Sequence, residues 1–139
     1  TALYATPDLK RKLKSIQNDL FDLGADLCVP ISENNNGRLR VSTSQIETLE
    51  AEIDEMNNIL KPLNSFILPG GCKSATFLHL ARTICRRAER SVVSLRSKEE
   101  INDNTLIYLN RLSDWLFVAS RVENQENSTE VLWSPGKNK

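Results

Sequence analysis

The sequence has no long apolar run and no excess of either charge. Its longest apolar run, from Trp115 to Ala119, has five residues, far fewer than the roughly 20 that cross a bilayer. The 18 Lys and Arg residues equal the 18 Asp and Glu residues. This balance argues against a general polyanion binder, because such a domain is usually clearly basic. We therefore expect neither a membrane protein nor a nucleic-acid-binding protein.

Cysteine and histidine are too few and too scattered to predict a metal site or a catalytic dyad. Cys28, Cys72 and Cys85 are odd in number and have no short metal-type spacing, so we interpret them as buried thiols in a reducing compartment. Because no signal-peptide pattern opens the chain, we expect a cytoplasmic protein. His79 is the only histidine and has no companion ligand, so we expect it to pack or to hydrogen-bond. No Cys–His or Ser–His–Asp set predicts conventional nucleophilic catalysis.

The sequence does have helical periodicity in four long segments, where apolar residues recur every three or four positions. Thr6-Pro7-Asp8 provides an N-cap, a proline at the first helical position and an acid in the first turn. Ser42, Thr43 or Ser44 can cap the second segment. Polar or Gly-containing connections separate the segments, which predicts an all-α, up-and-down helical bundle forming one domain over residues 1–139. The periodic segments are 9–27, 46–63, 78–95 and 106–119.

Three arginines form a stripe on the third segment. Arg82, Arg86 and Arg90 lie at i, i+4 and i+8, so their side chains share one helix face and repel one another by a few tenths of a kcal/mol per pair. Glu89 can neutralise only one of them. The stripe therefore needs either acidic partners, within or between subunits, or a phosphate-rich ligand whose oxygens fit the guanidinium fork. The pattern alone leaves both alternatives open.

The fourth segment carries two polar residues one turn apart. Asp114 is a candidate partner for an arginine of the third segment, and Asn110 can bind a ligand or another helix. Residues 68–74 combine two glycines with Lys73 but lack the P-loop spacing. We therefore interpret them as a tight turn before the third helix.

These motifs resemble the PduO-type corrinoid adenosyltransferases. The resemblance is carried by residues 66–71 (FILPGG), 78–90 (LHLARTICRRAER) and 108–117 (YLNRLSDWLF). Residues 16–27 and 131–136 are also similar to this family, so the resemblance extends over nearly the whole chain. The long arginine-rich motif is its most specific part.

The resemblance implies an enzyme that transfers the 5′-deoxyadenosyl group of ATP, with Mg²⁺, to cob(I)alamin, giving adenosylcobalamin and triphosphate. It implies a homotrimer of five-helix, ferritin-like bundles with active sites between subunits, and an adenosylcobalamin-dependent acceptor enzyme as a further partner. Arg82 would form an ion pair at the subunit interface, Phe66 would line the corrinoid pocket, and Arg86 would be the catalytic residue. No residue is a certain Mg²⁺ ligand. The residues implied to bind ATP are Arg86, Arg87, Ala88, Glu89, Arg90 and Asn110.

The start of the chain departs from the family pattern. The family begins with a Thr/Gly-rich nucleotide loop and a first helix that carries an Asp-Glu-Leu-Asn-like motif, whereas residues 1–5 resemble only the end of that helix. We therefore expect about four of the five helices. Two alternatives to the enzyme stay open: a corrinoid-binding or delivery module without catalysis, and a structural bundle whose arginines form salt bridges between subunits. ATP turnover with reduced corrinoid and corrinoid binding distinguish the three hypotheses.

Overall fold

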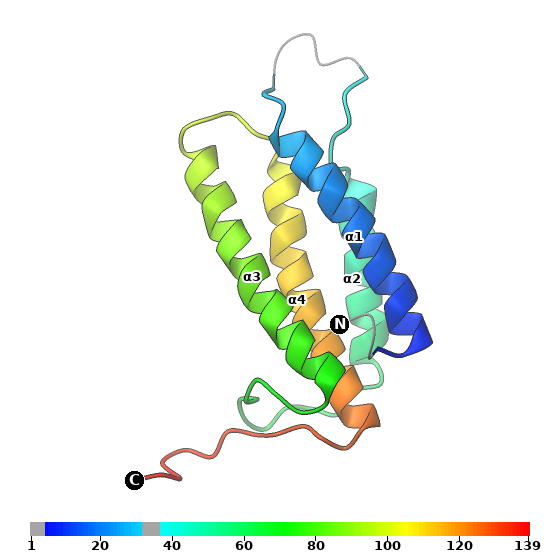
Figure 1. The fold of residues 1–139 in the computed structure, drawn as a ribbon, viewed down its shortest axis with the longest axis vertical. Helices are drawn as coiled ribbons and strands as arrows, with labels where there is room; N and C mark the ends of the chain where they lie inside the picture. Colours follow the sequence, from blue (N-terminus) through cyan, green and yellow to red (C-terminus); the bar gives the residue numbers. More distant parts are fainter. Residues whose placement is uncertain (1–4, 32–36) are drawn as a thin grey trace.

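The computed structural model describes residues 5–31 and 37–139. Within them, consecutive helices run in opposite directions along the long axis of the molecule (Figure 1). This arrangement confirms the predicted all-α, up-and-down fold with four helices. No helix in the described part of the chain is long and apolar enough to cross a membrane. The helices are α1 (Pro7–Leu27), α2 (Thr43–Asn57), α3 (Lys73–Arg96) and α4 (Asp103–Glu126).

α4 is the central helix of the bundle. It packs along α3 and α2 and touches α1 less extensively. Tyr108 and Trp115 of α4 are completely buried, and each uses its polar end to bond a neighbouring helix. The Tyr108 hydroxyl donates to Asp19 of α1 (2.9 Å), and the Trp115 indole donates to Glu52 of α2 (2.7 Å). Burial and the hydrogen bond to Asp19 raise the pKa of Tyr108.

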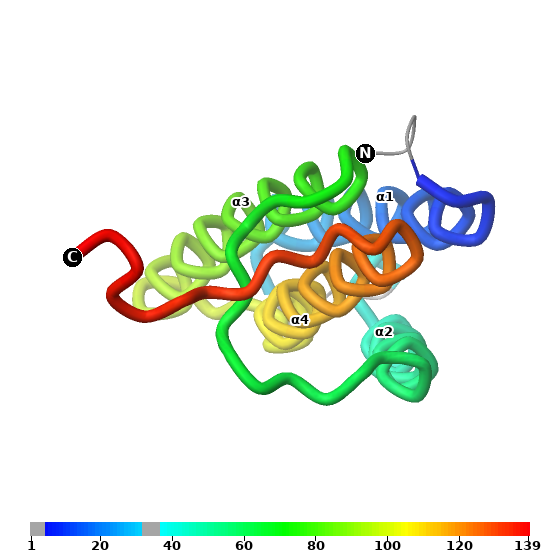
Figure 2. Tube along the Cα trace, turned by 90° about the horizontal axis from the view of Figure 1, so that it is seen from below, coloured from blue at the N-terminus to red at the C-terminus, as the bar shows by residue number. Residues whose placement is uncertain are grey.

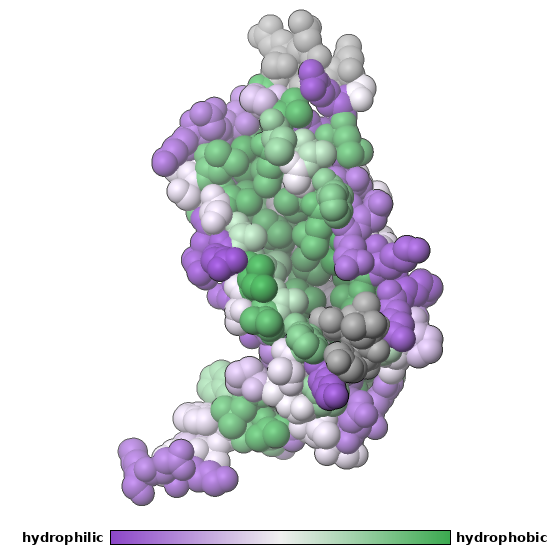
Figure 3. All heavy atoms as spheres, viewed as in Figure 1, coloured by the Kyte–Doolittle hydropathy of each residue, from purple (hydrophilic) through white to green (hydrophobic). Residues whose placement is uncertain are grey.

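An apolar groove separates α1 from α3 and has α4 as its floor. Leu13 and Leu20 line its α1 side, Ala81 and Ile84 line its α3 side, and Leu112 lies at the floor. Figure 3 shows this apolar band on the surface between the two helices. Leu20 and Ile84 keep 39% and 49% of their surface exposed. The bundle is therefore less closely packed between α1 and α3 than around α4.

The predicted helix starts are confirmed in detail. Thr6 is the N-cap of α1, where its side-chain oxygen accepts from the Leu9 backbone N–H (3.4 Å), and Pro7 occupies the first helical position. Ser42 is the N-cap of α2, and its backbone N–H donates to Gln45 Oε1 (2.9 Å). These side chains satisfy backbone groups that the first turn of a helix leaves unpaired.

The end of α2 differs from the prediction. The helix stops at Asn57, so the prediction that helical periodicity continues to Leu63 is wrong. Gln125 of α4 donates to the Ile59 carbonyl (2.8 Å), and Pro62 disfavours helical backbone at the residue before it. Tertiary contact with α4 therefore accompanies a turn at residues 58–60 and non-helical backbone at 61–63, despite the helix-like spacing.

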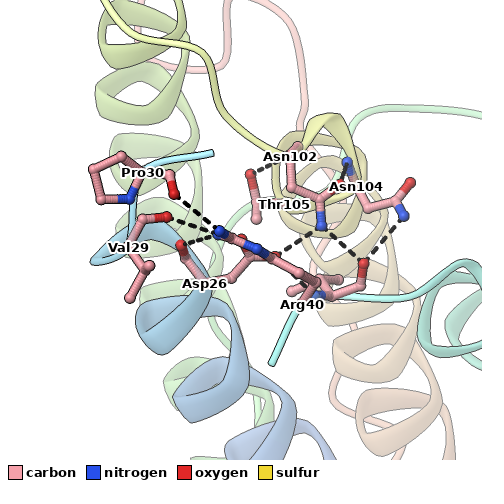
Figure 4. A network of polar contacts seen from close by, with 8 residues as sticks. Asp26, Val29, Pro30, Arg40, Asn102, Asn104 and Thr105 are labelled. Atoms are coloured by element: carbon pink, nitrogen blue, oxygen red, sulfur yellow. Dashed lines mark hydrogen bonds and ion pairs between the residues drawn. The ribbon is translucent and has the colours of Figure 1, made fainter. Parts of the chain in front are cut away.

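A buried ion pair closes the end of the bundle where α1 ends and α2 and α4 begin. Arg40 Nη1 donates to Asp26 Oδ1 (2.7 Å) and to the backbone carbonyls of Asp26 and Val29 (2.8 Å each). The second carboxylate oxygen of Asp26 accepts from the Val41 backbone N–H and from Asn102 Nδ2, both at 2.7 Å (Figure 4). Asp26 is only 1% exposed. One carboxylate thus ties three segments together.

Two sequence expectations concern residues that are partly outside the described ranges. The predicted loop over residues 30–40 agrees with the non-helical backbone at 28–31 and 37–42, but most of its polar run at 33–37 is not described. Residues 1–4, interpreted as the end of a family helix, are likewise outside the described ranges. Ala5 is buried and immediately precedes the N-cap of α1.

Candidate functional site

The arginine-rich motif lies along α3, and most of its guanidinium groups are exposed. Arg86, Arg87 and Arg90 are exposed, and none of their guanidinium groups has a hydrogen bond or an ion pair among the described residues. Arg82 is partly buried, and its guanidinium carbon lies 5.0 Å from the centroid of the Phe117 ring on α4. The only intramolecular partner of the arginine stripe within the described chain is therefore aromatic rather than acidic.

Antiparallel packing of α3 on α4 brings Asn110 to the motif. Asn110 Nδ2 donates to Glu89 Oε1 (2.9 Å), and its Oδ1 accepts from Arg111 (3.1 Å). Glu89 thus bonds an amide and makes no ion pair with an arginine of the stripe within the described chain. Ala88 is half-buried and lines the groove between α1 and α3. The structure therefore places Asn110 and Glu89 together, whereas Ala88 lines a different surface.

Asp114 does not make the predicted ion pair. It is exposed, and within the described residues it has neither a hydrogen bond nor an ion pair. The packing of α3 on α4 explains the difference, because Arg82 reaches the Phe117 ring and Arg86 stays in solvent. Asp114 therefore forms no ion pair with an α3 arginine within the described chain, and its role as a helix-pairing residue stays a prediction.

Buried polar atoms accompany the contact between Arg82 and Phe117. His79 Nε2, Arg82 Nε and Ser113 Oγ are buried and have no hydrogen-bond partner in the described part of the chain. His79 is 7% exposed, and burial, followed by the nearby Arg82 charge, lowers its pKa. Of the two predicted roles for His79, packing is therefore the one that the structure supports.

Cys85 is not an activated nucleophile. Cys85 is buried against α4, its thiol donates to the Leu109 carbonyl (3.2 Å), and burial raises the pKa of this thiol to about 11. All three cysteines are unpaired, with Cys72 half-buried and Cys28 exposed. The interpretation as buried thiols is confirmed for Cys85 and wrong for Cys28.

Phe66 lies in the connection between α2 and α3, at the end of the bundle away from the Arg40 network. Its side chain is 76% exposed, so Phe66 does not fill the core of this chain. The C-terminal segment crosses the connection, as Figure 2 shows (red over green). The Trp133 N–H donates to the Phe66 carbonyl (2.7 Å), and the Leu68 N–H donates to the Val131 carbonyl (2.9 Å). Phe66 is thus presented on a short paired segment rather than on a helix.

The last turns of α4 hold the glycine turn that follows Phe66. Asn124 Nδ2 donates to the Gly70 carbonyl (2.9 Å), and Asn124 Oδ1 accepts from the Cys72 backbone N–H (3.0 Å). Gly71 has a φ of +102°, and a Cβ there would lie 2.0 Å from Asn124 Oδ1. The glycine is therefore required by backbone conformation and by the close approach of Asn124, which confirms the tight turn predicted in place of a P-loop.

For three residues of this region, the sequence pattern does not indicate the contact that each one makes. Phe117 was only one apolar position of a longer motif, and Asn124 and Trp133 lie where helical periodicity has ended. Trp133, which ends the short apolar run at residues 131–133, is the single signal that the sequence offers. The partners of Phe117, Asn124 and Trp133 lie far from them in the sequence, so only the folded chain shows these contacts.

The described residues do not form a protein cage for a metal ion. Among them, no group of three or more His, Cys, Asp and Glu side chains is positioned to hold one. Mg²⁺ in phosphate-binding sites is usually held by one or two carboxylates together with phosphate oxygens and water.

Comparison with known proteins identifies the family. Residues 1–123 match the cobalamin adenosyltransferase family. A corrinoid adenosyltransferase of Mycobacterium bovis is 49% identical over 127 residues, which cover 89% of this chain and 65% of that protein. One of Bacillus subtilis is 48% identical over 117 residues, covering 84% of this chain and 59% of that protein. The chain belongs to the cobalamin adenosyltransferase family and spans less than two thirds of these two relatives.

Solved structures agree with the family assignment. A variant of the PduO-type ATP:corrinoid adenosyltransferase of Lactobacillus reuteri, complexed with cobalamin and ATP, superimposes with a TM-score of 0.85 at 38% identity. The match covers 92% of this chain and 71% of that protein. A second variant, complexed with ATP, gives a TM-score of 0.83.

Proposed function

We propose that the protein transfers the 5′-deoxyadenosyl group of ATP to cob(I)alamin, giving adenosylcobalamin and triphosphate. The observation that carries the proposal is the exposed set of guanidinium groups at Arg86, Arg87 and Arg90, which have no intramolecular partner among the described residues. Such groups suit a triphosphate, because guanidinium forks bind phosphate oxygens bidentately. Membership of the family supports the same conclusion.

In the proposed reaction, the protein residues bind and orient ATP and cob(I)alamin, and no protein side chain acts as the nucleophile. Cob(I)alamin is itself the nucleophile: its cobalt forms a bond to C5′ of ATP, the C5′–O bond breaks, and triphosphate leaves with the electron pair. Arg86 stabilises the negative charge that develops on triphosphate as it leaves. Because this charge is largest after the C5′–O bond has begun to break, the contact stabilises the transition state more than bound ATP and raises the rate. Arg87, Glu89, Arg90 and Asn110 complete the contacts with ATP. The family resemblance also assigns Ala88 to ATP, although its side chain lines the groove between α1 and α3.

Phe66 provides the lower face of the corrinoid site. Cob(II)alamin is difficult to reduce to cob(I)alamin by an external one-electron donor while its lower axial ligand donates electron density to cobalt. A phenyl ring has no lone pair and can occupy that face without coordinating. Support comes from the 76% exposure of Phe66 on a segment outside the helical core.

Assembly into a homotrimer, with Arg82 in an ion pair at the subunit interface, is part of the proposal. Support comes from the buried Arg82 Nε, which lacks a hydrogen-bond partner in the described chain. Light scattering should give three times the chain mass, and a monomer mass at all concentrations would contradict the trimer.

The proposal also includes a cytoplasmic location and transfer of the product to an adenosylcobalamin-dependent enzyme. The three unpaired cysteines support a reducing compartment.

The proposal is tested by incubating the protein with ATP and chemically reduced cobalamin and following the loss of cob(I)alamin absorbance. We expect adenosylcobalamin and triphosphate in equal amounts. Corrinoid binding without product would favour a delivery module instead. Binding of neither substrate would favour a structural bundle.

A further inference from the structure

Phe66 and Trp133 form an exposed aromatic pair at the end of the bundle. Their ring centroids are 5.8 Å apart, and the ring planes meet at 61°. Phe66 is 76% exposed and Trp133 is 44% exposed, so neither ring is held by a surrounding core. The edge-to-face contact is therefore a specific restraint on the Phe66 ring.

Backbone pairing fixes which residues meet across this contact. Ile67 and Leu132 form an antiparallel bridge, which places Phe66 directly opposite Trp133. The Trp133 N–H donates to the Phe66 carbonyl (2.7 Å), and the Ser65 hydroxyl donates to the Trp133 carbonyl (2.8 Å). Residues directly opposite in an antiparallel pair have neighbouring side chains on the same face. The meeting of the two rings follows from this register.

α4 anchors both partners of the pair. Arg121, whose side chain is 8% exposed, bonds Glu130 in the C-terminal segment (3.0 Å) and the Lys61 carbonyl in the α2–α3 connection (2.9 Å). The segment that carries Trp133 is therefore tied to the same helix as the segment that carries Phe66. A change in the Trp133 side chain should leave this anchoring intact.

We propose that Trp133 is a positioning residue that holds the Phe66 ring in the orientation needed at the lower face of the corrinoid. The inference rests on the function proposed above, because it gives Trp133 a role only through Phe66. Without the indole ring, the exposed phenyl ring can adopt any staggered rotamer that its backbone allows. The fraction of Phe66 in the productive orientation should then fall about two- to tenfold, as expected for the loss of one aromatic pair.

The test compares Trp133→Ala and Trp133→Phe with Leu132→Ala. Leu132 is a matched control, because it is adjacent, is 47% exposed, and its side chain points to the other face of the paired segment. Two quantities are measured: the NMR ring-current shifts of Phe66 without any substrate, and the fraction of four-coordinate cob(II)alamin formed in the presence of ATP. Thermal unfolding identifies any variant that does not fold, and Trp133→Leu replaces Trp133→Ala in that case.

We expect Trp133→Ala to remove the ring-current shifts and to lower the four-coordinate fraction about two- to tenfold, with ATP affinity unchanged. Trp133→Phe should restore most of both signals, and Leu132→Ala should change neither. If Phe66→Ala abolishes the four-coordinate species while Trp133→Ala keeps it, the positioning role is wrong and the proposed function stands. If Phe66→Ala itself keeps the species, the role proposed for Phe66 fails, and the inference fails with it.

Discussion

The guanidinium group of Arg82 lies over the ring of Phe117, with 5.0 Å between its central carbon and the ring centroid. The contact joins α3 to α4 and gives one charge of the arginine stripe an aromatic partner, worth about 0.5–2 kcal/mol. Arg86 and Arg90, farther along the same helix, have no such partner in the described chain and remain exposed. The stripe is thus divided into one arginine that is held by the fold and others that are available to a ligand.

The availability of Arg86 leads to a prediction about turnover. Arg86→Ala should lower the rate of adenosylcobalamin formation about 10²–10³-fold, because a charge contact to the leaving triphosphate is lost. Arg96 is the control: it is also on α3 but bonds Asp103 (2.9 Å) in an exposed ion pair. Arg96→Ala should leave the rate nearly unchanged. Equal effects of the two substitutions would contradict the assignment, and Arg86→Lys should recover only part of the rate, since the bidentate fork is lost.

The exposure of Phe66 leads to a prediction about stability. Phe66→Ala should change the free energy of unfolding by no more than about 1 kcal/mol, because surface substitutions have small effects. Leu78→Ala, at a side chain that is 0% exposed, should cost about 2–5 kcal/mol. Urea unfolding measures both. A large loss at Phe66 would mean that its ring is buried in the molecule in solution.

The hydrogen-bond network of Arg40 and Asp26 leads to a prediction about the stability of the protein, at the end of the bundle away from Phe66. Arg40→Ala should destabilise the protein by about 3 kcal/mol or more, because it leaves the buried Asp26 carboxylate without its counter-charge. Arg38 is a nearby exposed control, and Arg38→Ala should be almost neutral. Urea unfolding again provides the measurement, and similar midpoints for the two variants would argue against a structural role of the Asp26 network.

Burial of His79 predicts a dependence of stability on pH. Its pKa is lowered in the fold by burial and by Arg82, while the unfolded chain has a histidine pKa of about 6.5. Below that value the unfolded state binds a proton that the folded state does not, so stability is full above about pH 6.5 and falls as the pH decreases toward the folded pKa.

Thermal unfolding at about pH 7 and about pH 5.5 should therefore show a loss of stability in the wild type. A His79→Gln variant should lose less over the same interval, because it removes the only histidine of the chain. An identical loss in both proteins would show that other groups cause the pH dependence.

Local features of the fold were predictable because their causes lie within one or two helical turns. Thr6 and Pro7 begin α1 through a cap and a fixed φ, and Gly70 and Gly71 end the connection before α3. The periodicity of residues 46–63 gave the wrong end for α2, because Gln125, distant in sequence, bonds the backbone at Ile59. A pattern of apolar residues contains no information about such a bond.

Four amphipathic helices and the arginine stripe on the third could be predicted from residue spacing and capping, because both act within a single helix. The partner of each polar side chain could not, because it depends on how the helices pack. The packing register of α3 on α4 placed Arg82 over Phe117 and Asn110 beside Glu89, and it left Asp114 in solvent. These contacts depend on where distant segments meet, which is set by burial of the whole core rather than by any local pattern.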